Sequence, residues 1–234
     1  MAAGVAALSA IAMIQSNAQL TYVDAVSGLS GNTTLANGNL FSPPLNGTTG
    51  LDNNWELRTP LGAFDGIFES RGENFAEDAP EIRTTISGLT PGAAYAVYVN
   101  FWDPTSNVED WNVRAGFSSN PGANTLFSNP DAIADLGGLG AGSVLASTFT
   151  YSFAPDIFLE SSRDLRSGSL GIAIADGSGQ IAVYVDDNAV GAANVNRRTW
   201  YDGVSFLQVP EPSSFALAAL GLARIVMRRR QEKA

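Results

Sequence analysis

One of the clearest β-strand patterns in the sequence is the stretch Ile172-Ala173-Ile174-Ala175-Asp176-Gly177-Ser178-Gly179-Gln180-Ile181-Ala182-Val183-Tyr184-Val185. Two short apolar runs, 172–175 and 181–185, flank a polar turn that contains two glycines. β-Branched residues favour strands, and glycine adopts the positive φ angles of tight turns without steric cost. The stretch therefore predicts a β-hairpin, in which the two runs pair with each other across the turn.

A second strand is predicted at Ala94–Trp102. Side chains alternate between the two faces of a strand. One face of this segment carries Tyr95, Val97, Val99 and Phe101, and the other carries Tyr98 and Trp102. Apolar residues on both faces indicate a strand in the middle of a sheet, with both of its faces covered.

The turn before this strand has the sequence Leu89-Thr90-Pro91-Gly92-Ala93-Ala94-Tyr95. It resembles the tyrosine-corner turn of fibronectin-type-III-like sandwiches. The resemblance implies that Leu89 fills the core and that Tyr95 bonds back to the turn. The body is about twice the length of such a module, so we interpret the turn as a shared device and not as family membership.

Turn dipeptides such as Asn37-Gly38 and Pro121-Gly122 recur between short β-rich runs. This pattern predicts an all-β protein, an antiparallel β-sandwich of jelly-roll-like form. One short helix is expected at 129–137, where Asn129-Pro130 provides an N-cap followed by proline. The predicted strands are Leu20–Val26, Asn54–Arg58, Gly66–Ser70, Glu81–Ile86, Ala94–Trp102, Trp111–Phe117, Val144–Thr150, Leu170–Ala175, Ile181–Asp186 and Thr199–Leu207.

The composition excludes several kinds of chemistry. The chain has 234 residues with no cysteine and no histidine, so catalytic triads, thiol chemistry and the usual zinc sites are excluded. The formal net charge is −10, and five of the 13 lysine and arginine residues lie in the C-terminal tail, so the remaining body is more acidic than the whole chain. Such an acidic body repels nucleic acid, which is therefore not an expected partner.

Carboxylates and aromatic side chains supply two sets of candidate site residues. Paired carboxylates hydrolyse glycosides, and acidic residues cluster in one part of the chain, but such charge runs are usually solvated, so no catalytic residue is predicted. Flat indole rings stack on sugars, which makes Trp102 and Trp111 the favoured ligand-binding candidates. The other sugar-stacking candidates are Trp55, Trp200 and Tyr201, and the carboxylate candidates are Glu69, Glu73, Glu77, Asp78 and Glu81.

Calcium is the candidate cofactor. It takes oxygen ligands, and carboxylates stand in or at the ends of predicted strands. The candidate ligands are Asp24, Asp186, Asp187 and Asp202. Turn chemistry alone also explains acidic residues at such positions, so the expected cofactor is none, with calcium as the alternative.

The N-terminal residues 1–18 have the character of a secretory signal peptide. Val5–Ile14 is apolar, and small residues precede a cleavage point between Ala18 and Gln19. The body of the protein is then expected to span residues 19–208.

The C-terminal residues 209–234 have three parts in fixed order. The first part is Val209-Pro210-Glu211-Pro212. Proline lacks an N–H and fixes φ, so this part is expected to be extended and to lie outside any sheet. The apolar run Phe215–Met227 follows and predicts a short transmembrane helix. Arg228, Arg229 and Arg230 complete the segment as a cationic cluster that resists crossing the membrane.

This order resembles the PEP-CTERM sorting signal of bacterial surface and secreted proteins. The resemblance covers only the tail, and it implies processing by an exosortase-type membrane peptidase. It further implies export to the envelope, cell surface or extracellular matrix, with membrane contact through the tail before processing. Exopolysaccharide is the partner that the resemblance suggests, for a non-enzymatic structural or adhesive protein. The alternatives are a carbohydrate-active enzyme with paired carboxylates and a periplasmic ligand-binding module.

Overall fold

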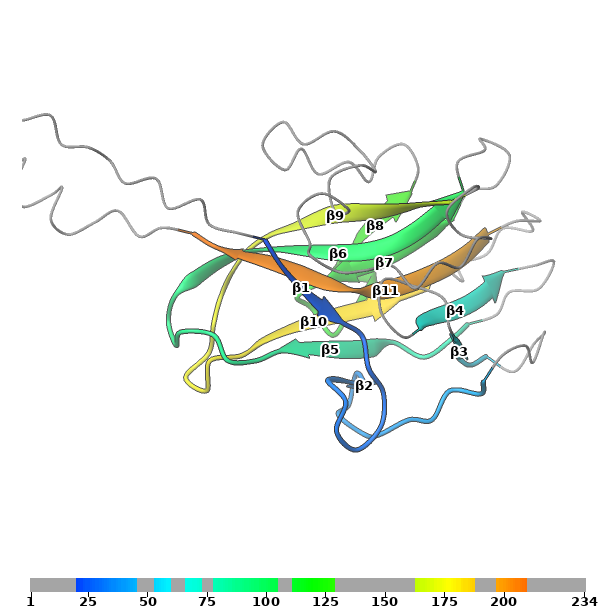
Figure 1. Cartoon of the computed structure of the whole chain (residues 1–234), viewed down its shortest axis with the longest axis horizontal. Helices are drawn as coiled ribbons and strands as arrows, with labels where there is room; N and C mark the ends of the chain where they lie inside the picture. The colour runs from blue at the N-terminus through cyan, green and yellow to red at the C-terminus, as the bar shows by residue number, and fades with distance from the viewer. Residues whose placement is uncertain are drawn as a thin grey trace, which may run out of the picture.

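The computed structural model describes residues 20–45, 53–59, 66–72, 78–104, 111–128, 163–187 and 197–209. These residues form two antiparallel sheets packed face to face, which confirms the predicted all-β sandwich (Figure 1). The predicted signal peptide, the strand at 144–150, the helix at 129–137 and the tail from Pro210 onward lie outside the described residues.

The first sheet, sheet A, has the order β3-β4-β11-β6-β9. Its strands are β3 (Glu56–Arg58), β4 (Ile67–Gly72), β11 (Arg197–Gln208), β6 (Ala94–Pro104) and β9 (Arg163–Ile174). A sixth strand, β1 (Thr21–Asp24), also pairs with β11. One edge of β11 is thus shared, because residues 197–201 pair with β4 and residues 203–206 pair with β1.

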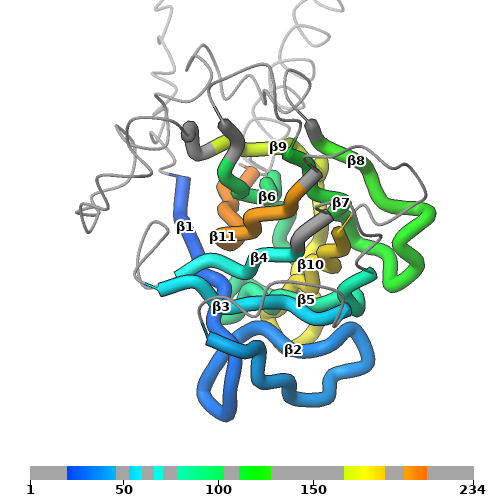
Figure 2. The backbone as a smooth tube through the Cα atoms, turned by 90° about the vertical axis from the view of Figure 1, so that its right-hand side faces the viewer, coloured from blue at the N-terminus to red at the C-terminus, as the bar shows by residue number. Residues whose placement is uncertain are grey.

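The second sheet, sheet B, has the order β2-β5-β10-β7-β8. Its strands are β2 (Thr33–Leu35), β5 (Ile82–Ile86), β10 (Ile181–Asp186), β7 (Asn112–Gly116) and β8 (Thr125–Ser128). A 3-10 turn at Pro121–Ala123 connects β7 to β8. Figure 2 looks roughly along the strands and shows the two sheets as separate layers.

Nine predicted strands overlap observed ones, but two short strands were missed. β2 has three residues and β8 has four, too few to produce a clear alternating pattern. β9 begins at Arg163, whereas the sequence predicted its start at Leu170, because residues 163–169 are charged and polar. β6 lies between β11 and β9, so the expected central strand is confirmed.

The predicted hairpin at 172–185 is wrong. β9 belongs to sheet A and β10 to sheet B, and the two strands do not pair. The turn at 176–179 instead carries the chain from one sheet to the other. The Asp-Gly-Ser-Gly sequence specifies a tight reversal, and that local geometry serves a crossing between layers as well as a hairpin.

Two such crossings meet at one end of the sandwich. The β5–β6 connection donates from Leu89 N to Gly179 O (3.0 Å) and from Gly92 N to Ala175 O (2.9 Å). Ala175 N donates in return to Ala93 O (3.0 Å). Leu89 is buried, and Thr90 N donates to the Tyr95 hydroxyl at 2.9 Å, which confirms the tyrosine corner.

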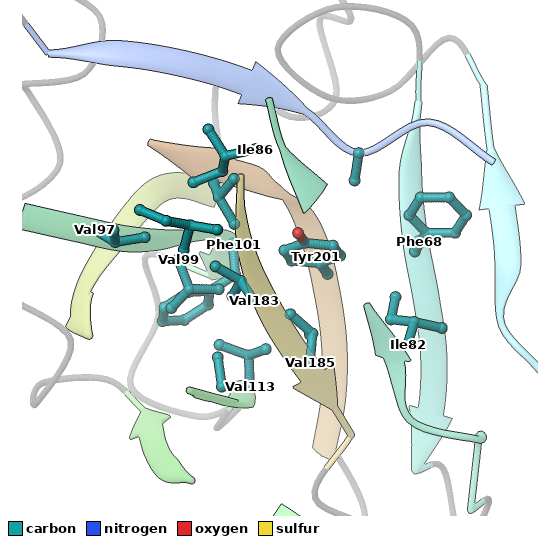
Figure 3. Packing of buried hydrophobic residues seen from close by; sticks show 14 of the residues in the cluster. Phe68, Ile82, Ile86, Val97, Val99, Phe101, Val113, Val183, Val185 and Tyr201 are labelled. Atoms are coloured by element: carbon teal, nitrogen blue, oxygen red, sulfur yellow. The ribbon is translucent and has the colours of Figure 1, made fainter. Parts of the chain in front are cut away.

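The core lies between the sheets and is mostly aliphatic. Val97, Val99 and Phe101 from β6 face Val183 and Val185 from β10 (Figure 3). A buried polar chain crosses this core, because the Tyr201 hydroxyl donates to Thr84 Oγ1 (2.7 Å), which bonds to Thr33 Oγ1 (2.9 Å). This chain links β11 of sheet A to β5 and β2 of sheet B.

Replacing Gly179 should destabilise the fold, because Gly179 lies where the β5–β6 and β9–β10 connections bond to each other. Gly179 has φ +70°, and a Cβ there would lie 2.3 Å from Leu89 O. We expect Gly179→Ala to lower the free energy of unfolding by about 1–3 kcal/mol, measured by urea denaturation. Gly177→Ala is the matched control, since no atom lies within 4 Å of its Cβ position and its φ is not positive. Equal effects of the two variants would contradict the expectation that the contact between Gly179 and Leu89 stabilises the fold.

Candidate functional site

Glu69, a predicted carboxylate candidate, is part of a closed ionic cage. Its side chain is fully buried and accepts hydrogen bonds from Arg58 Nη1 and, at 3.2 Å, from Arg198 Nη1. The Arg58 guanidinium lies over the Trp200 ring and that of Arg198 over the Trp111 ring. A buried carboxylate held by two arginines is a structural ion pair. Glu73 and Glu77 lie outside the described residues.

The tryptophans predicted to stack on sugar are buried, so the structure corrects this expectation. Trp102 is 3% exposed and donates from Nε1 to Asp202 Oδ2 at 3.0 Å. Trp111 is 1% exposed, and its ring centroid lies 4.4 Å from that of Trp200. Trp55, Trp200 and Tyr201 are also buried. Large aromatic side chains contribute strongly to a core. Here these five pack against other protein groups, so none presents an exposed ring face to a ligand.

Two of the predicted calcium ligands, Asp24 and Asp202, lie near the point on β11 where its pairing partner changes from β4 to β1. Asp202 is the extra residue of a β-bulge between Tyr201 and Gly203. The Tyr22 hydroxyl donates to Asp202 O (2.9 Å) and to Asp24 Oδ1 (3.3 Å). These groups therefore stabilise the bulge, which is a typical use of polar side chains at such an irregularity.

The other two predicted ligands lie at the end of β10. Asp187 is buried, and its Oδ2 accepts hydrogen bonds from the Ser70 hydroxyl and from Ala79 N (3.0 Å). Because Ser70 belongs to β4, Asp187 ties sheet B to sheet A. Among the residues that the structure describes, no three acidic side chains gather as metal ligands. The four predicted ligands do not form one site.

The structure instead gathers carboxylates from two different predicted sets. Asp186 of β10 is close enough to Asp187, Glu81 and Asp78 for their charges to act on it. Arg114 of β7 lies opposite Asp186 in the strand register and acts in the reverse direction. We call these five residues the Asp186 cluster. The sequence placed Asp78 and Glu81 among catalytic candidates and the other two carboxylates among calcium ligands.

The Asp186 cluster has unusual protonation. Burial, followed by the charges of Asp187, Glu81 and Asp78, raises the pKa of Asp186 from 3.8 to about 7. Burial also raises the pKa of Glu81. A carboxyl group with a pKa near 7 is substantially protonated at neutral pH, so it donates as well as accepts hydrogen bonds. Perturbed carboxyl groups of this kind mark candidate functional sites.

Beside the cluster, the outer face of sheet B carries a half-buried polar row. Val183 and Val185 point into the core, so Tyr184 between them points outward. Arg83 of β5 pairs in register with Tyr184 on one side and with Thr34 of β2 on the other. The Arg83 Nε atom is buried and has no hydrogen-bond partner among the residues that the structure describes. The row therefore combines an aromatic ring, a guanidinium group and a hydroxyl on one surface.

The N-terminal and C-terminal ends of the described body leave sheet A at the same end. Thr21 of β1 pairs with Phe206 of β11. β11 ends at Gln208, and Val209 N makes a last hydrogen bond to Ala94 O at 2.9 Å. Pro210 follows and has no N–H to continue the ladder. Within the described ranges, no helix has the length and apolar character that crossing a membrane requires.

Comparisons with known proteins identify the tail. Residues 208–230 match the family model of the PEP-CTERM protein-sorting motif. No curated protein sequence matches the chain. One solved structure that it resembles is a GH26-CBM35 β-(1,4)-mannanase from Podospora anserina, with 13% identity and a TM-score of 0.35. That alignment covers 83% of this chain and 29% of the mannanase chain.

The chain thus carries a PEP-CTERM sorting motif, which confirms the resemblance inferred from its tail. This motif marks proteins exported to the bacterial cell envelope or surface, and it implies processing by exosortase, a membrane protein. The matched residues begin at Gln208, which is the last residue of β11.

Neutralising Asp186 should change how stability depends on pH. Between about pH 4 and pH 7 the unfolded chain releases the Asp186 proton while the folded protein retains it, so the free energy of unfolding falls as pH rises. We expect Asp186→Asn to be more stable than the parent at pH 8 by about 1–2 kcal/mol, after solvent screening, and nearly equal at pH 4. Thermal unfolding at both pH values measures this. A variant destabilised equally at both would contradict the raised pKa.

Proposed function

We propose that this protein is an exported, non-enzymatic β-sandwich protein of the bacterial envelope or extracellular matrix that binds exopolysaccharide. The surface we assign to binding is the outer face of sheet B, from the Thr34–Arg83–Tyr184 row to the Asp186 cluster. The observation that supports it is the row itself, in which the buried Nε of Arg83 has no partner within the described part of the chain and lies beside a half-buried tyrosine.

The chemistry of this face suits a saccharide. A sugar ring presents hydroxyl groups around its edge and C–H groups on its faces, so it binds to side chains that both donate and accept beside a flat aromatic ring. Arg83 supplies donors, Glu81 supplies acceptors, and the Asp186 carboxyl group with its raised pKa supplies both. Tyr184 supplies the ring. Sheet A offers no such face among its tryptophans, since they are buried.

A carbohydrate-active enzyme is the second candidate, and one observation favours it. Glycoside hydrolysis requires one protonated and one ionised carboxyl group. Asp186 has its pKa raised to about 7, and the neighbouring carboxyl group of Asp187 accepts two hydrogen bonds through Oδ2. Asp187 is buried and ties the sheets together, so it is poorly placed to reach a substrate. We therefore favour a binding function over a catalytic one.

Substitutions on the sheet B face should weaken saccharide binding. We expect Tyr184→Ala and Arg83→Ala each to raise the Kd for exopolysaccharide of the producing bacterium by about 5- to 30-fold, because each removes about 1–2 kcal/mol of contact energy. Affinity gel electrophoresis measures this. Ile172→Ser is the matched control, since Ile172 is 65% exposed on the outer face of sheet A. Equal weakening by the control, or none by Tyr184→Ala, would overturn this assignment.

The same samples distinguish the enzyme. If the protein cleaves polysaccharide, reducing ends accumulate with time, and Asp186→Asn stops their release without abolishing binding. The non-enzymatic proposal expects no accumulation of reducing ends with either protein.

Processing of the tail should depend on Pro210-Glu211-Pro212. We expect replacement of these three residues by alanine to leave full-length protein in the membrane fraction, because the peptidase loses the extended segment that precedes the apolar run. An immunoblot of fractionated cells measures this. Replacing Ser213 and Ser214 by alanine is the control and should leave maturation nearly intact. Normal maturation of the Pro-Glu-Pro variant would contradict the sorting role.

A further inference from the structure

Sheet A has an exposed apolar patch on its outer face. Ile172 and Ile174 of β9 are 65% and 69% exposed. In the strand register they lie opposite Ala96 and Ala94 of β6, and Leu207 of β11 lies on the far side of Ala96. All five point away from the core, because Tyr95, Val97 and Phe206 between them point into it or pack against it. We call these five residues the Ile172–Ile174 patch.

The patch lies where the sorting tail leaves the body. Val209 N, the last backbone donor before Pro210, bonds to the carbonyl oxygen of Ala94, which is itself a patch residue. Five residues, Pro210–Ser214, separate Val209 from the apolar run that begins at Phe215. Fully extended, this connection spans about 20 Å. Any surface that holds the apolar run is therefore close to the patch.

We infer that the Ile172–Ile174 patch rests on the lipid bilayer surface while the tail is still attached. This inference depends on the sorting tail entering the membrane and is independent of saccharide binding. A short tether makes the local concentration of bilayer near the patch high, so even a small apolar surface is held against it. Proline fixes φ and disfavours the helical conformation of the residue before it, so the sequence predicts an extended connection at Pro210–Pro212.

The charge of the protein specifies the kind of lipid surface. The formal net charge is −10 and the tail holds five of the 13 lysine and arginine residues, so the body without the tail is more acidic still and repels anionic headgroups. Docking must therefore come from apolar side chains at the boundary between headgroups and acyl chains of neutral lipid. With sheet A facing the bilayer, the outer face of sheet B points away from it (Figure 2).

The absence of cysteine makes a direct test available. Single variants Ile174→Cys and Ile172→Cys of the full chain are labelled with an environment-sensitive NBD fluorophore and reconstituted into phosphatidylcholine vesicles. Leu29→Cys is the matched control, because Leu29 is also an exposed apolar residue (94%). It follows the Asp24 end of β1, whereas the opposite end of β1, at Thr21, lies where the tail leaves the body. Nitroxide-labelled lipid and aqueous iodide serve as quenchers, and circular dichroism checks that each labelled variant is folded.

We expect labels at 174 and 172 to be quenched by nitroxide lipid at least 2-fold more than the label at 29, and to be shielded from iodide. Labels at 174 and 29 that respond alike would overturn the inference, because the patch would then face water. Shielding from iodide without quenching by nitroxide lipid would also overturn it. In that case protein covers the patch, either as a second copy or as another segment of this chain.

Discussion

Three backbone hydrogen bonds at one end of the sandwich constrain most of the structure. They join the β5–β6 crossing to the β9–β10 crossing through Leu89, Gly92 and Ala175. Each crossing connects sheet A to sheet B, so bonding them to each other fixes the offset between the sheets. The strands are antiparallel ladders of fixed register, and this offset therefore sets what lies at their far ends. The position of Asp186, at the far end of β10, follows from it.

Buried polar groups carry the same constraint through the interior. Tyr201 reaches Thr84, Asp187 reaches Ser70, and each pair joins one sheet to the other. An unpaired polar group in a core is costly, so these pairs disfavour any slipped arrangement of the two layers. The consequence for function is indirect. Glu69 and the tryptophans are buried in contacts within the protein, whereas Arg83 and Tyr184 on the outer face of sheet B are only half-buried.

The two outer faces of the sandwich thus differ in character. Sheet A presents an apolar patch at the end where the sorting tail departs, whereas sheet B presents Tyr184 beside charged side chains. The two surfaces lie on opposite sides of the sandwich because they belong to different sheets, and in each strand every second residue points away from the core.

The sequence by itself determined the features that depend on neighbouring residues. The alternation in Ala94–Trp102 predicted a central strand, Leu89 to Tyr95 predicted the corner, and the tail predicted its own sorting role. Tertiary structure alone decided which strands pair, because pairing depends on contacts between residues far apart in the chain. It separated 172–175 from 181–185 into different sheets, buried Trp102 and Trp111, and brought Glu81 to Asp186. Periodicity and turn chemistry are local, whereas burial and charge coupling are set by the packing of distant segments.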